Sequence, residues 1–162
     1  MENKLKIEIV KWIDEHEFLT MIREKVFIEE QKVTPQLEWD GMDKEAIHFL
    51  AYKDNKAVGC ARAFMIQNDM QLGRMAVLKE CRGEGIGSAL IEIALATAKL
   101  NQLSGIYISA QCHAINFYKK FGFEVTSDIY LDAEIPHRDM KLDFQKYFLN
   151  DSRYRCSFNM IE

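Results

Sequence analysis

Three glycines stand close together in the segment Arg82-Gly83-Glu84-Gly85-Ile86-Gly87-Ser88, which is the strongest local signal in the chain. The segment lies between a predicted strand and a predicted helix. Glycine lets the backbone turn sharply and approach a ligand closely, and the first turn of a helix offers unpaired N–H groups at the positive end of its dipole. This combination is suited to binding a phosphate group through the main chain.

Two common phosphate-binding motifs do not fit the segment. A P-loop requires a lysine directly after its last glycine, whereas Ser88 follows Gly87 here. A dinucleotide fingerprint requires G-x-G-x-x-G with an acidic residue about 20 positions further on, and neither feature is present. The pattern that remains is R-x-x-G-x-G, which runs from Arg82 through Gly85 to Gly87.

A second signature follows downstream, in Ala114-Ile115-Asn116-Phe117-Tyr118-Lys119-Lys120-Phe121-Gly122-Phe123. Together the two segments resemble the signatures of the GNAT superfamily of N-acetyltransferases, Q/R-x-x-G-x-G/A for the acetyl-coenzyme A loop and A-x-x-F-Y-x-x-x-G-F. The segments 24–31, 38–43 with His48, and 135–140 resemble the ElaA/YjcF-type branch of small bacterial GNAT proteins. The resemblance covers residues 6 to 144.

The resemblance implies a fold and an activity. It implies a GNAT-like, splayed, mostly antiparallel sheet of six to seven strands flanked by helices, in which strand 72–77 diverges from strand 106–110 to admit the pantetheine arm. It implies transfer of an acetyl group from acetyl-coenzyme A to a primary amine by direct attack in a ternary complex. The cofactor-binding residues that it implies are Met75, Ala76, Val77, Arg82, Gly83, Gly85, Ile86, Gly87, Ser88, Asn116 and Tyr118.

Acetyl transfer to an amine sets three chemical requirements. The amine must lose a proton, because an alkylamine with a pKa of ~10 is mostly protonated at neutral pH. The developing oxyanion needs N–H donors, which the resemblance places in the backbone near Met75–Val77. The leaving thiolate needs a proton donor, and the resemblance implies that Tyr118 is this donor.

The general base is left open. The candidates are Glu38, Asp40, Asp43 and His48, and we favour His48 because its ordinary pKa of ~6.5 suits the task. A chain of waters with no single base is the alternative. Glu38 and Asp40 are also candidates for attracting a cationic amine substrate, since loops often carry substrate contacts.

Each of these residues also has a purely structural interpretation. Tyr118 could fill the core beside Phe117 and Phe121, and His48 could be a hydrogen-bonded structural residue. The loop with Glu38 and Asp40 could be ordinary solvated surface. A thiol nucleophile at Cys112 is rejected, because its neighbour His113 cannot face it from the adjacent position.

Composition limits the classes of protein that remain. The chain has 162 residues, of which 48% are hydrophobic and 28% charged, which predicts a globular domain with a sizeable core. A formal net charge of -4 argues against a nucleic-acid partner, and no apolar run reaches the ~18 residues of a membrane span. The four cysteines lack a C-x-x-C pair, which predicts free thiols, a cytoplasmic location and no metal site.

Periodicity and turn residues predict a mixed α+β order of elements. The expected strands cover 6–12, 48–52, 58–66, 71–78, 106–110, 124–130 and 137–144, and the expected helices cover 14–31, 88–100 and 116–121. Asp14 is the expected N-cap of the first helix, Gly122 the expected C′ residue of the last, and 32–46 an irregular loop. We expect one acetyltransferase domain over 1–144 and a C-terminal extension, 145–162, that packs on this domain or on a partner.

Several points of function stay open at this level. The acceptor could be a small-molecule amine or a peptide amine, because the motifs do not distinguish acceptors. A non-catalytic sensor or regulatory protein that binds acyl-coenzyme A on the same fold is the alternative function, and a longer acyl group is a second alternative. A homodimer is a further prediction, drawn from the apolar residues of the C-terminal extension.

Overall fold

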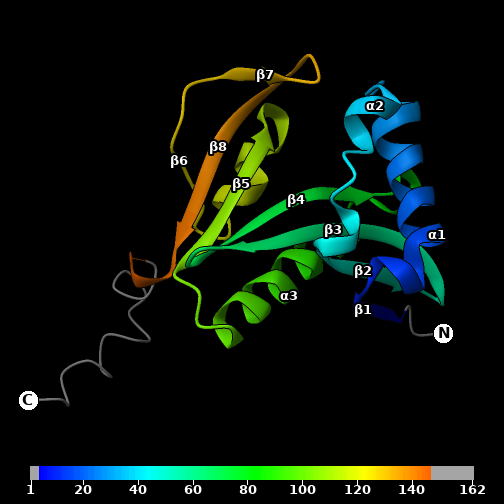
Figure 1. The fold of residues 1–162 in the computed structure, drawn as a ribbon, viewed down its shortest axis with the longest axis horizontal. Helices are drawn as coiled ribbons and strands as arrows, with labels where there is room; N and C mark the ends of the chain where they lie inside the picture. The colour runs from blue at the N-terminus through cyan, green and yellow to red at the C-terminus, as the bar shows by residue number, and fades with distance from the viewer. Residues whose placement is uncertain (1–3, 147–162) are drawn as a thin grey trace, which may run out of the picture. The chain divides into compact units, whose positions relative to one another are not determined.

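The computed structural model describes residues 4–146 and has the predicted mixed α+β architecture (Figure 1). Eight strands, mostly antiparallel, are flanked by helices. The count exceeds the predicted six to seven because the expected strand over 124–130 is two short strands, β6 (Glu124–Val125) and β7 (Tyr130–Asp132). The chain forms two compact units: the first is the chain up to Phe64 with Leu72–Thr97, and the second is Met65–Gln71 with the chain from Ala98 onward.

The first unit is built on antiparallel strands in the order β1 (Leu5–Val10), β2 (Ile47–Lys53), β3 (Lys56–Ile66) and β4 (Asp69–Val77). Strand β1 pairs along its whole length with β2, from Leu5 opposite Lys53 to Val10 opposite His48. The predicted hairpin turn between β2 and β3 is confirmed: Asp54 and Asn55 both have positive φ, of 50° and 63°, as a two-residue hairpin requires.

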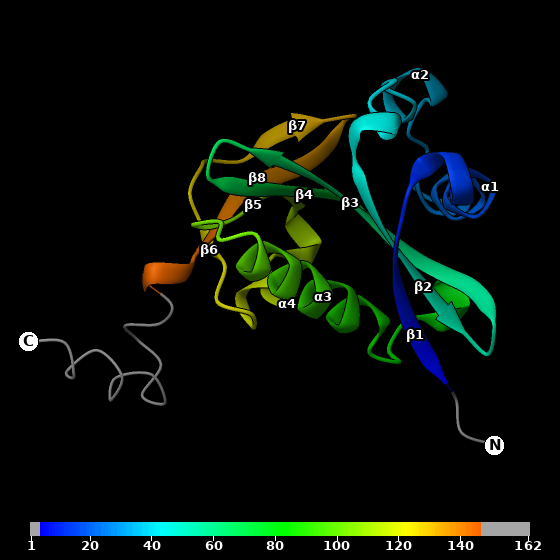
Figure 2. The ribbon, with the colours of Figure 1, turned by 60° about the horizontal axis from the view of Figure 1, so that its bottom comes forward.

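Two helices cover opposite faces of this sheet, α1 (Trp12–Arg23) and α3 (Ile86–Leu100) (Figure 2). Helix α3 packs so closely on β3 that a Cβ at Gly59 would lie 3.0 Å from Ile86 Cγ2. Helix α1 buries Leu19 and Ile22 completely. The apolar spacing that predicted both helices therefore marks the faces that enter the core.

The predicted helix over 14–31 differs from the observed one in its start and in its second half. Helix α1 begins at Trp12, and Lys11 rather than Asp14 is its N-cap, because the Lys11 carbonyl already accepts the Asp14 and Glu15 amides. A π-helix continues α1 over Glu24–Glu30. The predicted irregular loop over 32–46 contains the short helix α2 (Pro35–Glu38) and a 3₁₀ turn over Asp43–Glu45.

The second unit is centred on β8 (Ile135–Asp143), which pairs antiparallel with β5 (Gly105–Gln111), β6 and β7. One face of the β5–β8 ladder forms the core of this unit. Its members are Ile106, Ile108, Ala110, Met140 and Leu142, which are at most 3% exposed. Helix α4 (Ile115–Lys119) has Lys120 as its C-cap, so Gly122, with a φ of 95°, lies one position beyond the predicted C′ position.

The structure bears on three further predictions, which concern the C-terminal extension, membrane-spanning helices and the cysteines. Of the predicted extension over 145–162, only Gln145 and Lys146 lie within the described residues, where both amides bind Asp143 Oδ1. Between residues 4 and 146, no helix has the length and apolar character needed to cross a membrane. Three cysteines of this region, Cys60, Cys81 and Cys112, are free thiols as predicted.

Candidate functional site

The glycine loop is an open turn that leads from β4 into α3. Gly83 and Gly85 have φ of 81° and 83°, a conformation that other residues rarely adopt. A Cβ at either position would meet no atom within 4 Å, so the outer side of the loop is unobstructed. Because the Gly85 carbonyl accepts the Ala89 amide at 3.0 Å, the N–H groups of residues 86–88 lead the helix and have no partner within it.

Side chains on both sides of the loop fasten it to the first unit. Arg82 donates through Nε to the Val77 carbonyl at 3.0 Å and through Nη2 to Glu30 Oε2 at 2.6 Å. This bond to Arg82 holds the pKa of the Glu30 carboxyl below its ordinary value. Lys53 Nζ lies 2.8 Å from both carboxylate oxygens of Glu84. Both the guanidinium and the amide of Arg82 thus bind groups of the protein itself, since the amide donates to the Lys79 carbonyl at 3.3 Å.

Strand β4 contains a local distortion beside the residues predicted to line the pantetheine arm. Arg74 has a φ of 47° although it lies within the strand. A non-glycine residue in this region is strained, and such strain concentrates at functional sites. The distortion changes the direction of the peptide groups next to Met75. Ala76 is buried, and Met75 and Val77 are half-buried. The predicted oxyanion donors therefore lie directly after the irregular residue.

The other two predicted cofactor residues, Asn116 and Tyr118, belong to α4 in the second unit. Asn116 is exposed and Tyr118 is half-buried. The Tyr118 ring packs edge-on against Phe117 and Phe123, with centroids 5.1 and 5.8 Å away. Burial raises the pKa of the Tyr118 phenol to about 12, so the phenol keeps its proton at neutral pH and can donate it.

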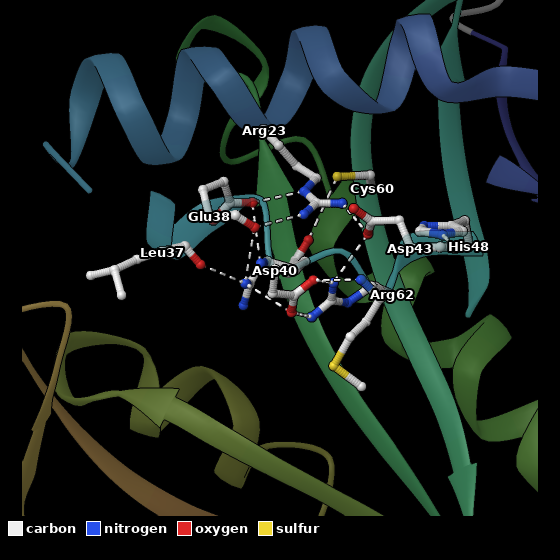
Figure 3. A network of polar contacts seen from close by, with 10 residues as sticks. Arg23, Leu37, Glu38, Asp40, Asp43, His48, Cys60 and Arg62 are labelled. Atoms are coloured by element: carbon white, nitrogen blue, oxygen red, sulfur yellow. Dashed lines mark hydrogen bonds and ion pairs between the residues drawn. The ribbon is translucent and has the colours of Figure 1, made fainter. Parts of the chain in front are cut away.

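A network of buried ion pairs fills the space between α1, α2 and β3 (Figure 3). Arg23 is at its centre and is only 1% exposed. Its Nε donates to Glu38 Oε1 at 2.7 Å, and its Nη1 donates to Asp43 Oδ1 at 2.6 Å. The guanidinium also lies over the Trp39 ring, 4.8 Å from its centroid. Arg23 thus ties the last residue of α1 to both ends of the segment 38–43.

The same network continues to two arginines of the sheet. Arg62 donates to Asp40 Oδ2 at 2.8 Å and to Asp43 Oδ1 at 3.0 Å. Arg74 donates to the Glu38 carbonyl at 3.1 Å, and its Nε lies 3.2 Å from Glu38 Oε1. Three arginines and three carboxylates therefore balance each other, which offsets the cost of removing charges from water.

These contacts bear on the predictions for the segment 38–43. Glu38 and Asp43 are 3% and 6% exposed and are held in ion pairs, so the expectation of an ordinary solvated surface is wrong for them. Glu38 and Asp40, the predicted substrate contacts, already face arginines of the same chain. The sequence signal for this network is the presence of Arg62 and Arg74 in otherwise apolar strands.

These arginines make the contribution of Asp40 to the free energy of unfolding depend on pH. The hydrogen bond from Arg62 lowers the pKa of the Asp40 carboxyl from 3.8 to about 2. A depressed pKa in the folded state contributes stability that is complete above pH 3.8 and is lost as the pH falls through 2. We expect Asp40→Asn to lower the free energy of unfolding by about 1–2 kcal/mol at pH 6, and this difference from the unaltered protein should close near pH 2. Urea unfolding at a series of pH values measures it, and a difference that stays constant would contradict the assignment.

His48, the favoured candidate for the general base, lies inside the first unit. Its ring is 1% exposed, contacts the Trp12 ring and donates from Nε2 to the Asp43 carbonyl at 2.8 Å. Burial lowers the pKa of the imidazole. A fully buried ring that orients the network has no path to an acceptor amine. The geometry therefore favours the structural interpretation of His48.

Comparison with known proteins decides the family. Residues 15–144 match the model of the acetyltransferase (GNAT) domain. The chain belongs to the GNAT acetyltransferase family. It is 37% identical over 123 residues to a Bacillus subtilis protein named as an uncharacterized N-acetyltransferase, YjcF, and this match covers 75% of the chain and 88% of YjcF. The predicted family and its ElaA/YjcF-type branch are confirmed.

Solved structures of GNAT proteins share the fold. The crystal structure of Escherichia coli ElaA superposes with a TM-score of 0.77 at 27% identity, over 86% of this chain and all of ElaA. A more distant neighbour, at 15% identity and a TM-score of 0.65, is the PaiA N-acetyltransferase of Thermoplasma acidophilum, solved in complex with coenzyme A. The superposition covers 86% of this chain and 99% of the PaiA chain. At this identity the likeness shows the fold alone.

Proposed function

We propose that the protein is an N-acetyltransferase that moves an acetyl group from acetyl-coenzyme A to a primary amine of a small molecule or peptide. The observation that carries the proposal is the loop before α3, with two glycines in the left-handed region, an open outer side and the leading amides of residues 86–88. Membership of the GNAT family and the coenzyme A bound by the distant neighbour PaiA support it. Binding of acetyl-coenzyme A is common to an acyltransferase and to a sensor, so release of free thiol from acetyl-coenzyme A in the presence of an amine is the measurement that separates the two functions.

The loop fits the diphosphate of coenzyme A by its chemistry. Main-chain N–H groups at a helix start attract an anion without a side-chain cation, and Gly83, Gly85 and Gly87 leave room for its oxygens. Arg82, through Glu30 and the Val77 carbonyl, holds the loop in place. Met75, Ala76 and Val77 would contact the pantetheine arm, and the family resemblance implies that Asn116 and Tyr118 contact coenzyme A as well.

The proposed reaction is direct attack of the amine on the thioester carbonyl in a ternary complex. The nitrogen forms the new C–N bond, the carbonyl oxygen becomes an oxyanion, and amides near Met75–Val77 donate to it. The C–S bond then breaks, and the phenol of Tyr118 donates to the leaving thiolate. The amine loses its proton to a water chain or to a base outside the buried network, since His48 and Glu38 are enclosed.

Gly85→Glu tests the binding site, because it adds a carboxylate at the helix start where the diphosphate would lie. We expect the affinity for coenzyme A, measured by calorimetry, to fall at least tenfold from like-charge repulsion. Gly41→Glu is the matched control: Gly41 has a similar φ of 77° and equally open surroundings, but it lies outside the loop. Equal affinity in the two variants, or no coenzyme A binding by the unaltered protein, would refute the proposal.

A further inference from the structure

The second unit carries a polar face on the side of the β5–β8 ladder opposite its core. Side chains of a strand alternate between the two faces of a sheet, so Ser109 and Asp139, which are paired in the register, share this face. Tyr107 and Lys141 form the next pair on the same side. Tyr130 of β7 is opposite His137 and reaches the same group of side chains. His137 and Asp139 lie in the segment 135–140 that resembles the ElaA/YjcF-type branch, and the other residues of this face lie outside the segments that carry the GNAT resemblance.

Asp139 is the point at which the hydrogen bonds of this face converge. Tyr130 donates its hydroxyl proton to Asp139 Oδ1 at 2.5 Å, and Tyr107 is also hydrogen-bonded to the Asp139 side chain. Since the Tyr130 proton is used in this way, the Ser109 hydroxyl donates to the Tyr130 oxygen. Burial and then the bond to Asp139 raise the pKa of the Tyr130 phenol, and the bond to Asp139 and then burial raise that of Tyr107, so both phenols remain donors at neutral pH.

The charge of Asp139 has no cation to balance it within residues 4–146. Neither Asp139 nor the nearby Asp132 forms an ion pair with a basic side chain there. Lys141, the lysine on this face, lies 3.3 Å from Asp69 Oδ2 instead. A carboxylate has about four acceptor positions, and the two phenols occupy only two of them. Asp139 can therefore accept further hydrogen bonds from a cation.

Aromatic rings border this carboxylate. The Tyr130 and His137 rings are stacked, with centroids 6.1 Å apart and planes 22° apart. His137 is 8% exposed, and its Nδ1 donates to the Ile135 carbonyl at 2.6 Å, which fixes the ring in place. An unbalanced carboxylate beside fixed aromatic faces is suited to an ammonium ion, which gains from the charge and from cation–π attraction.

We propose that Asp139, with Tyr107, Tyr130 and His137, forms a binding site for the ammonium group of a primary amine that carries an apolar substituent. The carboxylate accepts the N–H groups of the ammonium, and the rings contact its apolar part. The assignment of this amine as the acetyl acceptor rests on the proposed function; the binding of the amine does not.

The test compares 2-phenylethylamine with 2-phenylethanol, which has the same shape but no charge at neutral pH. Each is titrated into the full chain while amide resonances of residues 105–111 and 130–139 are followed by NMR. We expect the amine to shift these resonances and the alcohol to bind at least tenfold more weakly. We also expect Asp139→Asn to weaken amine binding at least tenfold and Tyr107→Phe to weaken it less. Asp128→Asn, which removes an exposed carboxylate of the same unit, should leave it unchanged.

Equal binding of the alcohol and the amine to the unaltered protein would overturn the proposal, whether or not any variant folds. Amine binding by Asp139→Asn as strong as that of the unaltered protein would overturn it as well. Calorimetry with coenzyme A on the same samples separates this result from the proposed function. Loss of the amine site alone leaves the coenzyme A affinity intact, whereas failure of the proposed function appears as absent coenzyme A binding.

Discussion

Arg23→Met is expected to lower the free energy of unfolding by about 3–5 kcal/mol, because it leaves the three carboxylates of the network facing only two arginines, Arg62 and Arg74. Glu38 and Asp43 each lose a hydrogen bond from Arg23, of 2.7 and 2.6 Å. The Trp39 ring loses the guanidinium that lies over it. Methionine fills a similar volume, so the loss reports the charge and its hydrogen bonds rather than a cavity. Urea unfolding at pH 7 measures the effect.

Arg82→Met is the control for this prediction. Arg82 also donates to a carboxylate at 2.6 Å, but its side chain is 43% exposed, so its ion pair should contribute no more than about 1 kcal/mol. A double variant that adds Glu38→Gln to Arg23→Met should recover part of the lost stability, because two arginines then face two carboxylates and the network is neutral again. Equal losses for Arg23→Met and Arg82→Met would show that the network is not the main source of stability at this site.

Tyr118→Phe is expected to lower kcat about a hundredfold or more, which is the usual range for removing a positioned proton donor. The affinity for coenzyme A should change little, since the ring and its contacts with Phe117 and Phe123 remain. With a pKa of about 12, the phenol stays protonated through the working pH range. Tyr118 should therefore add no alkaline limb to the pH–rate profile below pH 10. Steady-state release of free thiol from acetyl-coenzyme A, across a panel of amines, gives both quantities.

Tyr52→Phe provides the matching control, because Tyr52 is a half-buried tyrosine of β2 with a pKa also raised by burial. It should leave kcat within about twofold of the unaltered protein. A Tyr118→Phe enzyme with full turnover would remove the phenol from the mechanism. No thiol release by the unaltered protein with any amine, together with tight coenzyme A binding, would favour the sensor function instead.

The order of elements could be predicted from the sequence because each one is a local pattern. The hairpin at Asp54 and Asn55, the apolar face of α3 and the positive φ of Gly122 after α4 depend on neighbouring residues only. The errors occur where local patterns are ambiguous. The π-helix over Glu24–Glu30 has only 7 residues, which is too short for its i→i+5 spacing to be distinguished from that of an α-helix in the sequence. The break between β6 and β7 depends on pairing with β8, which is distant in sequence.

The site could be predicted only in its main-chain part. The glycine loop is encoded by residue type, since the positive φ of Gly83 and Gly85 restricts what can stand there. The buried network is not local: Arg23 contacts residues 15 and 20 positions away, and Arg62 contacts Asp40 from 22 positions away. A carboxylate in a polar segment suggests a solvated loop until the facing arginine is known. The roles predicted for Glu38, Asp40 and His48 were drawn without that information.

The balance of three arginines against three carboxylates also limits how this part of the chain can evolve. A single replacement that changes a charge leaves the set unbalanced, and the cost is greatest at Arg23, Glu38 and Asp43, which are at most 6% exposed. The six positions should therefore be inherited as one set, either retained together or replaced together by apolar residues. Descendants of this protein can diversify freely around the set while the path of the segment that joins α1 to β2 stays the same.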